Sequence, residues 1–125
     1  MNAQRRSRHS YAETIAILTK EIGAAGNTVF VTIDQAAAAQ SVGLSLRPTT
    51  LIVFGNPKAG TAFMDACPLL GLDLPLKIQV WETESDVNVA FTPMAEIAAR
   101  YEVAGMNARV EAIDAALTKL LGNVT

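Results

Sequence analysis

The chain has 125 residues, half of them hydrophobic, which fits one small domain with its own apolar core. Charged residues make up 18% and the formal net charge is −2, which argues against the clustered basic surface of a nucleic-acid-binding protein. No apolar run approaches the roughly 18–20 residues of a membrane span, so we expect a soluble protein without membrane contact.

Residues 1–9 are polar and show no periodicity, so we predict a flexible tail ahead of a single domain over residues 10–125. The tail is basic, but no long apolar segment follows it, and it therefore does not resemble a signal peptide. We expect a cytoplasmic protein.

Apolar spacing and turn residues predict an α+β fold in which helices pack on an antiparallel-rich sheet of about four to five strands. The strands are expected over residues 28–33, 49–54, 76–82 and 87–91. Helices are expected over residues 10–22, 35–41, 61–66 and 92–101, with a last one whose apolar face is Val110, Ile113, Leu117 and Leu120.

Two local patterns carry most of this prediction. Ser10 and Glu13 have the spacing of a capping box, which marks the start of the first helix. Residues 76–82 alternate, so that Lys77, Gln79 and Trp81 are expected on one face of a strand, opposite its apolar side chains.

Residues 55–61, between a strand and a helix, invite comparison with a phosphate-binding P-loop. The two glycines have the right separation, but Thr61 stands where the P-loop lysine should follow Gly60, and Lys58 lies inside the loop. A nucleotide triphosphate site is therefore not predicted. A weaker anion site involving Asn56, Lys58 and the Thr61 amide stays open, beside the alternative that the segment is only a tight turn.

Two further segments contain candidate ligand contacts. Lys77 could contact an anion and Trp81 could stack on a ligand, with Glu82 next along the strand. The alternative is that this face is the outer or subunit-interface side of the sheet. Asp34 and Gln35 follow another strand, where Asp34 is most simply a helix N-cap and Gln35 cannot act as a general base.

No catalytic residue, metal site or cofactor is predicted. The chain has one cysteine, Cys67, and one histidine, His9, whereas a zinc site needs about three or four protein ligands. Cys67 has no histidine near it in the sequence to activate it as a nucleophile, so we expect a small buried side chain.

Several of these segments together resemble the bacterial domain of unknown function 302 family. The matching runs lie at residues 30–34, 47–49, 54–57, 60–61, 74–77 and 80–82, and the resemblance covers about residues 10–103. It implies an α+β sandwich with a topology like that of the TATA-binding protein, often dimeric, and it does not imply DNA binding.

The chain departs from the family pattern in two places. Gln35 stands where members usually have a histidine, so any chemistry of that histidine is not expected here. Members also usually begin with a strand ahead of the first helix, and here that strand is either lost or very short.

The resulting hypothesis is a dimeric binding module for a small apolar or anionic metabolite. The alternative is a protein–protein interaction or regulatory protein without a small ligand. An enzyme using Asp34, Lys58, Lys77 or Glu82 is less favoured, because no nucleophile–base pair is recognisable.

Overall fold

The computed structural model describes residues 3–125. The strands are β1 (Ala3–Arg6), β2 (Thr28–Asp34), β3 (Thr49–Gly55), β4 (Leu76–Glu82) and β5 (Val87–Phe91). The helices are α1 (Tyr11–Ala24), α2 (Gln35–Ser41), α3 (Pro57–Ala66), the short 3-10 helix η1 (Pro68–Leu72), α4 (Met94–Arg100) and α5 (Asn107–Gly122). The strands form one sheet in the order β1-β5-β4-β3-β2, with every neighbouring pair antiparallel, which confirms the predicted α+β fold.

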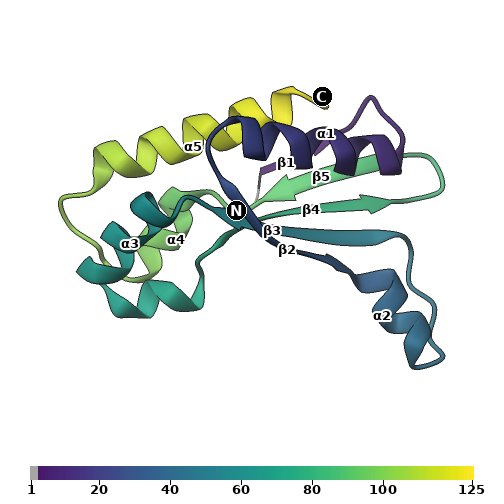
Figure 1. The fold of residues 1–125 in the computed structure, drawn as a ribbon, viewed down its shortest axis with the longest axis horizontal. Helices are drawn as coiled ribbons and strands as arrows, with labels where there is room; N and C mark the ends of the chain where they lie inside the picture. The colour runs from purple at the N-terminus through teal and green to yellow at the C-terminus, as the bar shows by residue number, and fades with distance from the viewer. Residues whose placement is uncertain (1–2) are drawn as a thin grey trace.

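Helices α1 and α5 lie together along one face of the sheet (Figure 1). The main core forms there, because alternate strand residues such as Ile52, Ile78 and Val89 meet Leu18 of α1 and Leu117 of α5, all buried. A second apolar cluster lies among α3, η1, α4 and the start of α5. The two clusters share Leu76 and Ile113, so the second cluster extends the core beyond one end of the sheet.

The opposite face of the sheet is formed by the alternate residues of the same strands. Across it, Val31 pairs with Val53 and Val53 with Lys77, while Leu51 pairs with Gln79. In Figure 1, α2 lies at one end of this side of the sheet and α3 and α4 lie at the other, and no helix of the described chain runs along the middle. We call this the uncovered face.

Strand β2 contains a bulge at Phe30. Val29 pairs with Phe54 and Val31 pairs with Val53, so one extra residue of β2 has no partner of its own in β3. The ring of Phe30 lies against Gly55, where an added Cβ would be 3.6 Å from Phe30 Cε2 and 3.7 Å from Pro75 Cβ. The bulge therefore directs an aromatic side chain to the end of β3.

The prediction of a flexible tail over residues 1–9 is wrong for residues 3–6, which form β1 against β5. Residues 1 and 2 lie outside the described residues. The segment after β1 is also fixed, since the Ser7 N–H donates to Val87 O at 2.8 Å and the Arg8 N–H donates to Val124 O at 2.8 Å. A short polar strand can form here because it needs only backbone pairing with the edge of β5. The strand that the family resemblance implies is thus present and very short.

The helix predicted over residues 61–66 begins four residues earlier, at Pro57. Proline fits the first helical position because it has no N–H to lose, and Asn56 caps the helix by accepting the Lys58 N–H at 3.0 Å. Elsewhere the predicted boundaries hold closely. Ser10 caps α1 as expected, with Oγ accepting the Glu13 N–H at 3.2 Å. Among residues 3–125, no helix combines the length and the apolar character needed to cross a bilayer.

Candidate functional site

The segment that suggested a phosphate loop is helical. Asn56 caps α3, while Lys58 and Thr61 lie within the first five residues of that helix. The Gly60 N–H donates to Asn56 O at 2.8 Å, as an ordinary helical amide does. A P-loop needs amides that point freely at a phosphate, and the helical hydrogen bond at Gly60 does not give that arrangement. The weaker anion site at Asn56, Lys58 and the Thr61 amide stays a prediction.

Asp34 and Gln35 lie at the start of α2. Asp34 Oδ1 accepts the Ala37 N–H at 2.9 Å, so the structural reading of Asp34 as an N-cap is confirmed. Asp34 pairs with Thr50 at one end of β3, whereas Asn56 follows Gly55 at the other end. Thr50 and Gly55 are five positions apart along the strand, about 17 Å, so Asp34 and Asn56 cannot contact one small ligand together.

Lys77 and Trp81 both belong to the uncovered face, as the alternation in β4 predicted. The Lys77 ammonium donates to the backbone carbonyls of Asp73 at 3.2 Å and of Pro75 at 2.8 Å. Glu82 comes next to Trp81 and therefore points to the other side of the sheet. Glu82 also lines a polar hollow beside the turn between β4 and β5, with Arg6, His9 and Asp86. The eight predicted ligand residues are thus distributed over several parts of the molecule.

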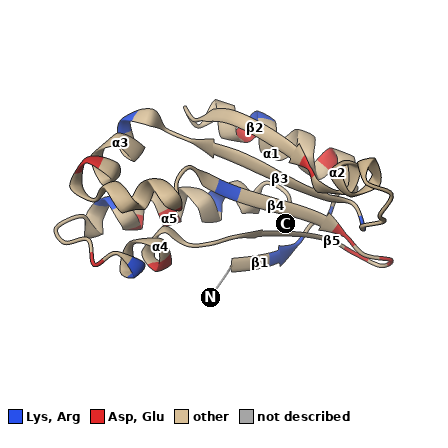
Figure 2. Cartoon of the chain, turned by 90° about the horizontal axis from the view of Figure 1, so that it is seen from below, with Lys and Arg blue, Asp and Glu red and all other residues tan. Residues whose placement is uncertain are grey.

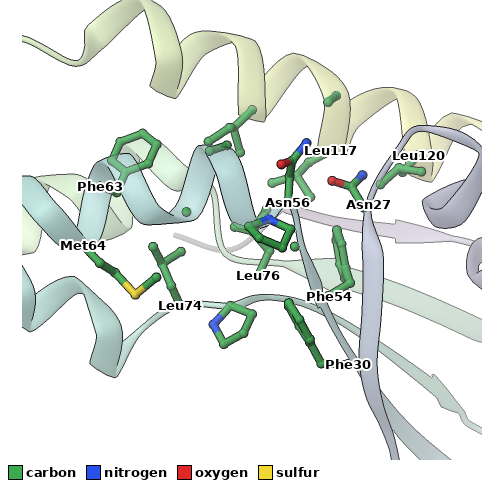
Figure 3. Close-up of a pocket in the computed structure, with 17 residues that line it drawn as sticks. Asn27, Phe30, Phe54, Asn56, Phe63, Met64, Leu74, Leu76, Leu117 and Leu120 are labelled. Carbon is green, nitrogen blue, oxygen red and sulfur yellow. The ribbon is translucent and has the colours of Figure 1, made fainter.

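A pocket that sequence reasoning did not find lies between α3, α5 and the ends of β2, β3 and β4 (Figure 3). Its volume is about 160 Å³. Helix α3 and its cap contribute Asn56, Pro57, Ala59, Gly60, Phe63 and Met64. Helix α5 contributes Ile113, Ala116, Leu117 and Leu120. The strands and their approaches contribute Asn27, Phe30, Phe54, Gly55, Leu74, Pro75 and Leu76.

The wall of this pocket is almost entirely apolar. Its floor consists of core residues, since Phe54 and Phe63 are 1% exposed and Leu117 is 2% exposed. Its mouth is formed by accessible side chains, because Phe30 is 51% exposed and Met64 is 38% exposed. Figure 3 shows these side chains converging from the sheet and from both helices. The arrangement is a small apolar cavity with an accessible mouth.

One of the eight predicted residues, Asn56, lines this pocket. The seven other predicted residues lie outside it and stay predictions, and the remaining pocket residues were not predicted for a physical reason. Pocket residues such as Phe54, Phe63 and Leu117 have the spacing of core positions, and nothing in the sequence distinguishes a side chain that borders a cavity from one that fills it. The run from Leu74 to Leu76 entered the sequence analysis only as part of the family resemblance, not as part of a pocket.

A polar cluster joins η1 to the end of α4. The Asp73 carboxylate accepts hydrogen bonds from the Arg100 guanidinium, at 3.1 Å, and from the Tyr101 hydroxyl. The hydrogen bond to Asp73, followed by partial burial, raises the pKa of Tyr101 above its usual value near 10. These hydrogen bonds tie the residue after η1 to the end of α4, next to the second apolar cluster.

Cys67 and His9 lie in different surroundings. Cys67 is partly buried beside Leu74 and Tyr101 in the second apolar cluster. His9 Nδ1 is 3.5 Å from Glu13 Oε2 at the start of α1. Within residues 3–125, no group of three or more histidine, cysteine, aspartate or glutamate side chains is arranged to hold a metal ion.

These features define a small α+β domain with an antiparallel sheet, helices that cover one face of that sheet, and an apolar pocket at the sheet end. Residues 3–124 match the family described as "Domain of unknown function DUF302", and the chain belongs to that family. A crystal structure of an uncharacterized conserved DUF302 protein from Bacillus stearothermophilus has the same fold, with a TM-score of 0.91. The two chains are 17% identical, and the similarity covers 99% of this chain and 98% of the other.

Three curated relatives from Brucella share a 79-residue stretch with this chain. It is 46% identical to the protein named fluoride-specific ion channel FluC 1 of Brucella suis and to that of Brucella abortus, and to FluC 2 of Brucella melitensis. The stretch covers 63% of this chain but only 31% or 29% of those proteins. The chain therefore spans less than a third of the length of the curated relatives it matches.

Proposed function

We propose that this protein is a binding module for a small, predominantly apolar molecule, which it holds in the pocket between α3 and α5. The observation that supports the proposal is a pocket of about 160 Å³ whose floor is apolar core and whose mouth is accessible. An engineered protein cavity of about 150 Å³ with an apolar lining binds benzene or xenon. A ligand of that size gains affinity here through burial of its own apolar surface.

Toluene is a suitable first probe, and the measurement is a titration followed by amide chemical shifts in a ¹H–¹⁵N spectrum. We expect saturable shifts at the amides of α3, the end of β3 and the middle of α5. An absence of saturable shifts up to the solubility limit of toluene would contradict the proposal.

The matched variants are Ala116→Leu and Ala115→Leu. Ala115 and Ala116 are neighbours on α5 and both are exposed, but Ala116 lines the pocket and Ala115 does not. Leucine is a good helix former, so both variants should fold. We expect Ala116→Leu to weaken toluene binding at least about tenfold, or about 1.4 kcal/mol, and Ala115→Leu to leave it unchanged.

We further propose that the module is a homodimer whose subunits meet through the uncovered face. Gln79 lies near the middle of this face, between Leu51 on β3 and Ala90 on β5. Trp81 and Ile33 on the same face are only partly buried within one chain. Covering this surface in a symmetric pair would remove apolar area from water.

Sedimentation equilibrium tests the dimer, with an expected mass of about twice 13.2 kDa. Gln79→Glu would place like charges near the symmetry axis and should shift the protein toward monomer. Gln40→Glu adds the same charge at an exposed position of α2 and should leave the mass unchanged. A monomer in the unmodified protein at high concentration would contradict this assembly.

A second candidate function comes from the Brucella relatives. Because a 79-residue stretch like this chain occurs in proteins named fluoride-specific ion channels, we propose as an alternative that the domain senses fluoride or acts beside such a channel. The test is thermal unfolding in sodium fluoride and in sodium chloride at equal ionic strength. A rise in Tm specific to fluoride would favour this function over an apolar ligand, whereas identical unfolding curves would contradict direct fluoride binding.

A further inference from the structure

The pocket has two polar side chains, and they lie together. Of the seventeen residues that line it, Asn27 and Asn56 alone carry a polar side-chain group. Thr28 pairs with Gly55, so Asn27 just before β2 and Asn56 just after β3 are at the same end of neighbouring strands. Figure 3 shows both carboxamides beside α5, at one side of the pocket.

Both carboxamides have hydrogen-bonding capacity left for a ligand. A carboxamide offers two N–H donors and an oxygen acceptor. Asn56 uses its Oδ1 to accept the Lys58 N–H at 3.0 Å, which leaves its two N–H donors. Within the described chain, no hydrogen bond involves the side chain of Asn27, so both its oxygen and its N–H donors remain for a ligand.

The same lining indicates the charge of the ligand. None of the seventeen lining residues is an aspartate, glutamate, lysine, arginine or histidine. An ionised group that enters an apolar site without a charged partner loses its hydration and regains little, which costs several kcal/mol or shifts its protonation. The pocket therefore favours a neutral ligand over the anionic one that Lys58 or Lys77 would have suggested.

We propose that the ligand is an uncharged amphiphile of about one aromatic ring, carrying one carbonyl or amide group. Its polar group hydrogen-bonds to the carboxamides of Asn27 and Asn56, and its apolar body packs against Phe63 and Leu117. The inference rests on the proposed binding function and adds the chemical class of the ligand. The volume of about 160 Å³ sets the size.

Toluene, benzamide and benzoate test the apolar body, the hydrogen-bonding group and the charge of the ligand separately, because they share a ring and differ in their polar group. Each is titrated against the protein and followed by amide chemical shifts. We expect benzamide to bind about five- to tenfold more tightly than toluene, the gain of about one net hydrogen bond. Benzoate, close in shape to benzamide but charged, should bind at least about tenfold more weakly than benzamide.

Variants locate the polar contact. Asn27→Leu should abolish the preference for benzamide over toluene while toluene still binds. Asn56→Asp keeps an oxygen to cap α3 but removes the N–H donors, so it should reduce the same preference without unfolding the helix. Asn88→Leu, on β5 and outside the pocket, should leave both affinities unchanged.

The outcomes separate the two proposals. If toluene binds but benzamide binds no better, or if benzoate binds most tightly, the ligand class is wrong and the apolar binding module stands. If the preference for benzamide survives both Asn27→Leu and Asn56→Asp, the carboxamide contact is wrong. If neither toluene nor benzamide binds, both the binding function and the ligand class are overturned.

Discussion

The carboxylate of Asp114, in α5, accepts a hydrogen bond from the backbone N–H of Met94 at 2.6 Å, and a second from the Ala95 N–H at 3.0 Å. Met94 begins α4, and its cap residue Pro93 supplies no side-chain acceptor. A residue of one helix thus caps another, twenty positions earlier in the chain. This contact fixes α4 against α5 and closes the second apolar cluster.

We expect Asp114→Ala to lower the free energy of unfolding by about 1–3 kcal/mol, because it leaves the N–H of the fully buried Met94 without an acceptor. Asp114→Asn keeps one oxygen and should cost less. Urea unfolding measures both. Asp65→Ala, at an exposed position of α3, is the control and should change stability by less than about 0.5 kcal/mol. Equal stability of Asp114→Ala and Asp65→Ala would mean that the cap contributes nothing.

The hydrogen bond between Tyr101 and Asp73 predicts an alkaline pH dependence. Asp73 raises the pKa of Tyr101, so the folded protein holds the phenol proton more tightly than the unfolded chain does. The resulting stabilisation is complete below the unfolded pKa near 10 and is lost as pH rises through the higher folded value. Urea unfolding between pH 8 and pH 12 should therefore show a steeper alkaline loss in the unmodified protein than in Tyr101→Phe. Parallel curves would exclude the linkage.

Tyr11 of α1 and Thr50 of β3 are joined across the core by a hydrogen bond of 2.5 Å between their hydroxyl oxygens. Thr50 is 4% exposed, so Tyr11→Phe leaves a buried hydroxyl without this partner. We expect a loss of about 1–2 kcal/mol in unfolding free energy. A double-mutant cycle with Thr50→Val isolates the pair, and strict additivity of the two changes would contradict a direct interaction.

Substitution of Lys77 tests whether a ligand binds in the pocket or at the site that the sequence suggested. Its ammonium binds two exposed backbone carbonyls and the residue does not line the pocket. Lys77→Ala should therefore leave the toluene affinity unchanged and alter stability by less than about 0.5 kcal/mol. A large loss of toluene affinity would mean that the binding site lies on the uncovered face beside Trp81 instead.

The fold was predictable because its signals are local. The alternation around Ile78 and Val80, and the caps at Ser10 and Asp34, each involve residues within a few positions of one another. Strand β1 was not predictable in the same way, since its polar residues are held by backbone pairing with β5, and the segment just after it is held by a hydrogen bond to Val124 O. The pocket could not be predicted from the sequence for a related reason. Its wall joins Phe30, Phe63 and Leu117, which meet only once the chain is folded.

The bulge at Phe30 restricts which sequence changes strand β2 can accept. Strand β2 is at the edge of the sheet and consists mainly of β-branched residues, a composition that would let a regular edge strand recruit strands from other molecules. The extra residue interrupts that regularity and at the same time supplies an aromatic wall of the pocket. Deleting Phe30 would straighten the ladder and remove an aromatic wall of the pocket, so the variant should self-assemble more readily and should no longer bind toluene. If the pocket has the proposed function, resistance to aggregation and binding at the pocket are coupled through this one bulged residue.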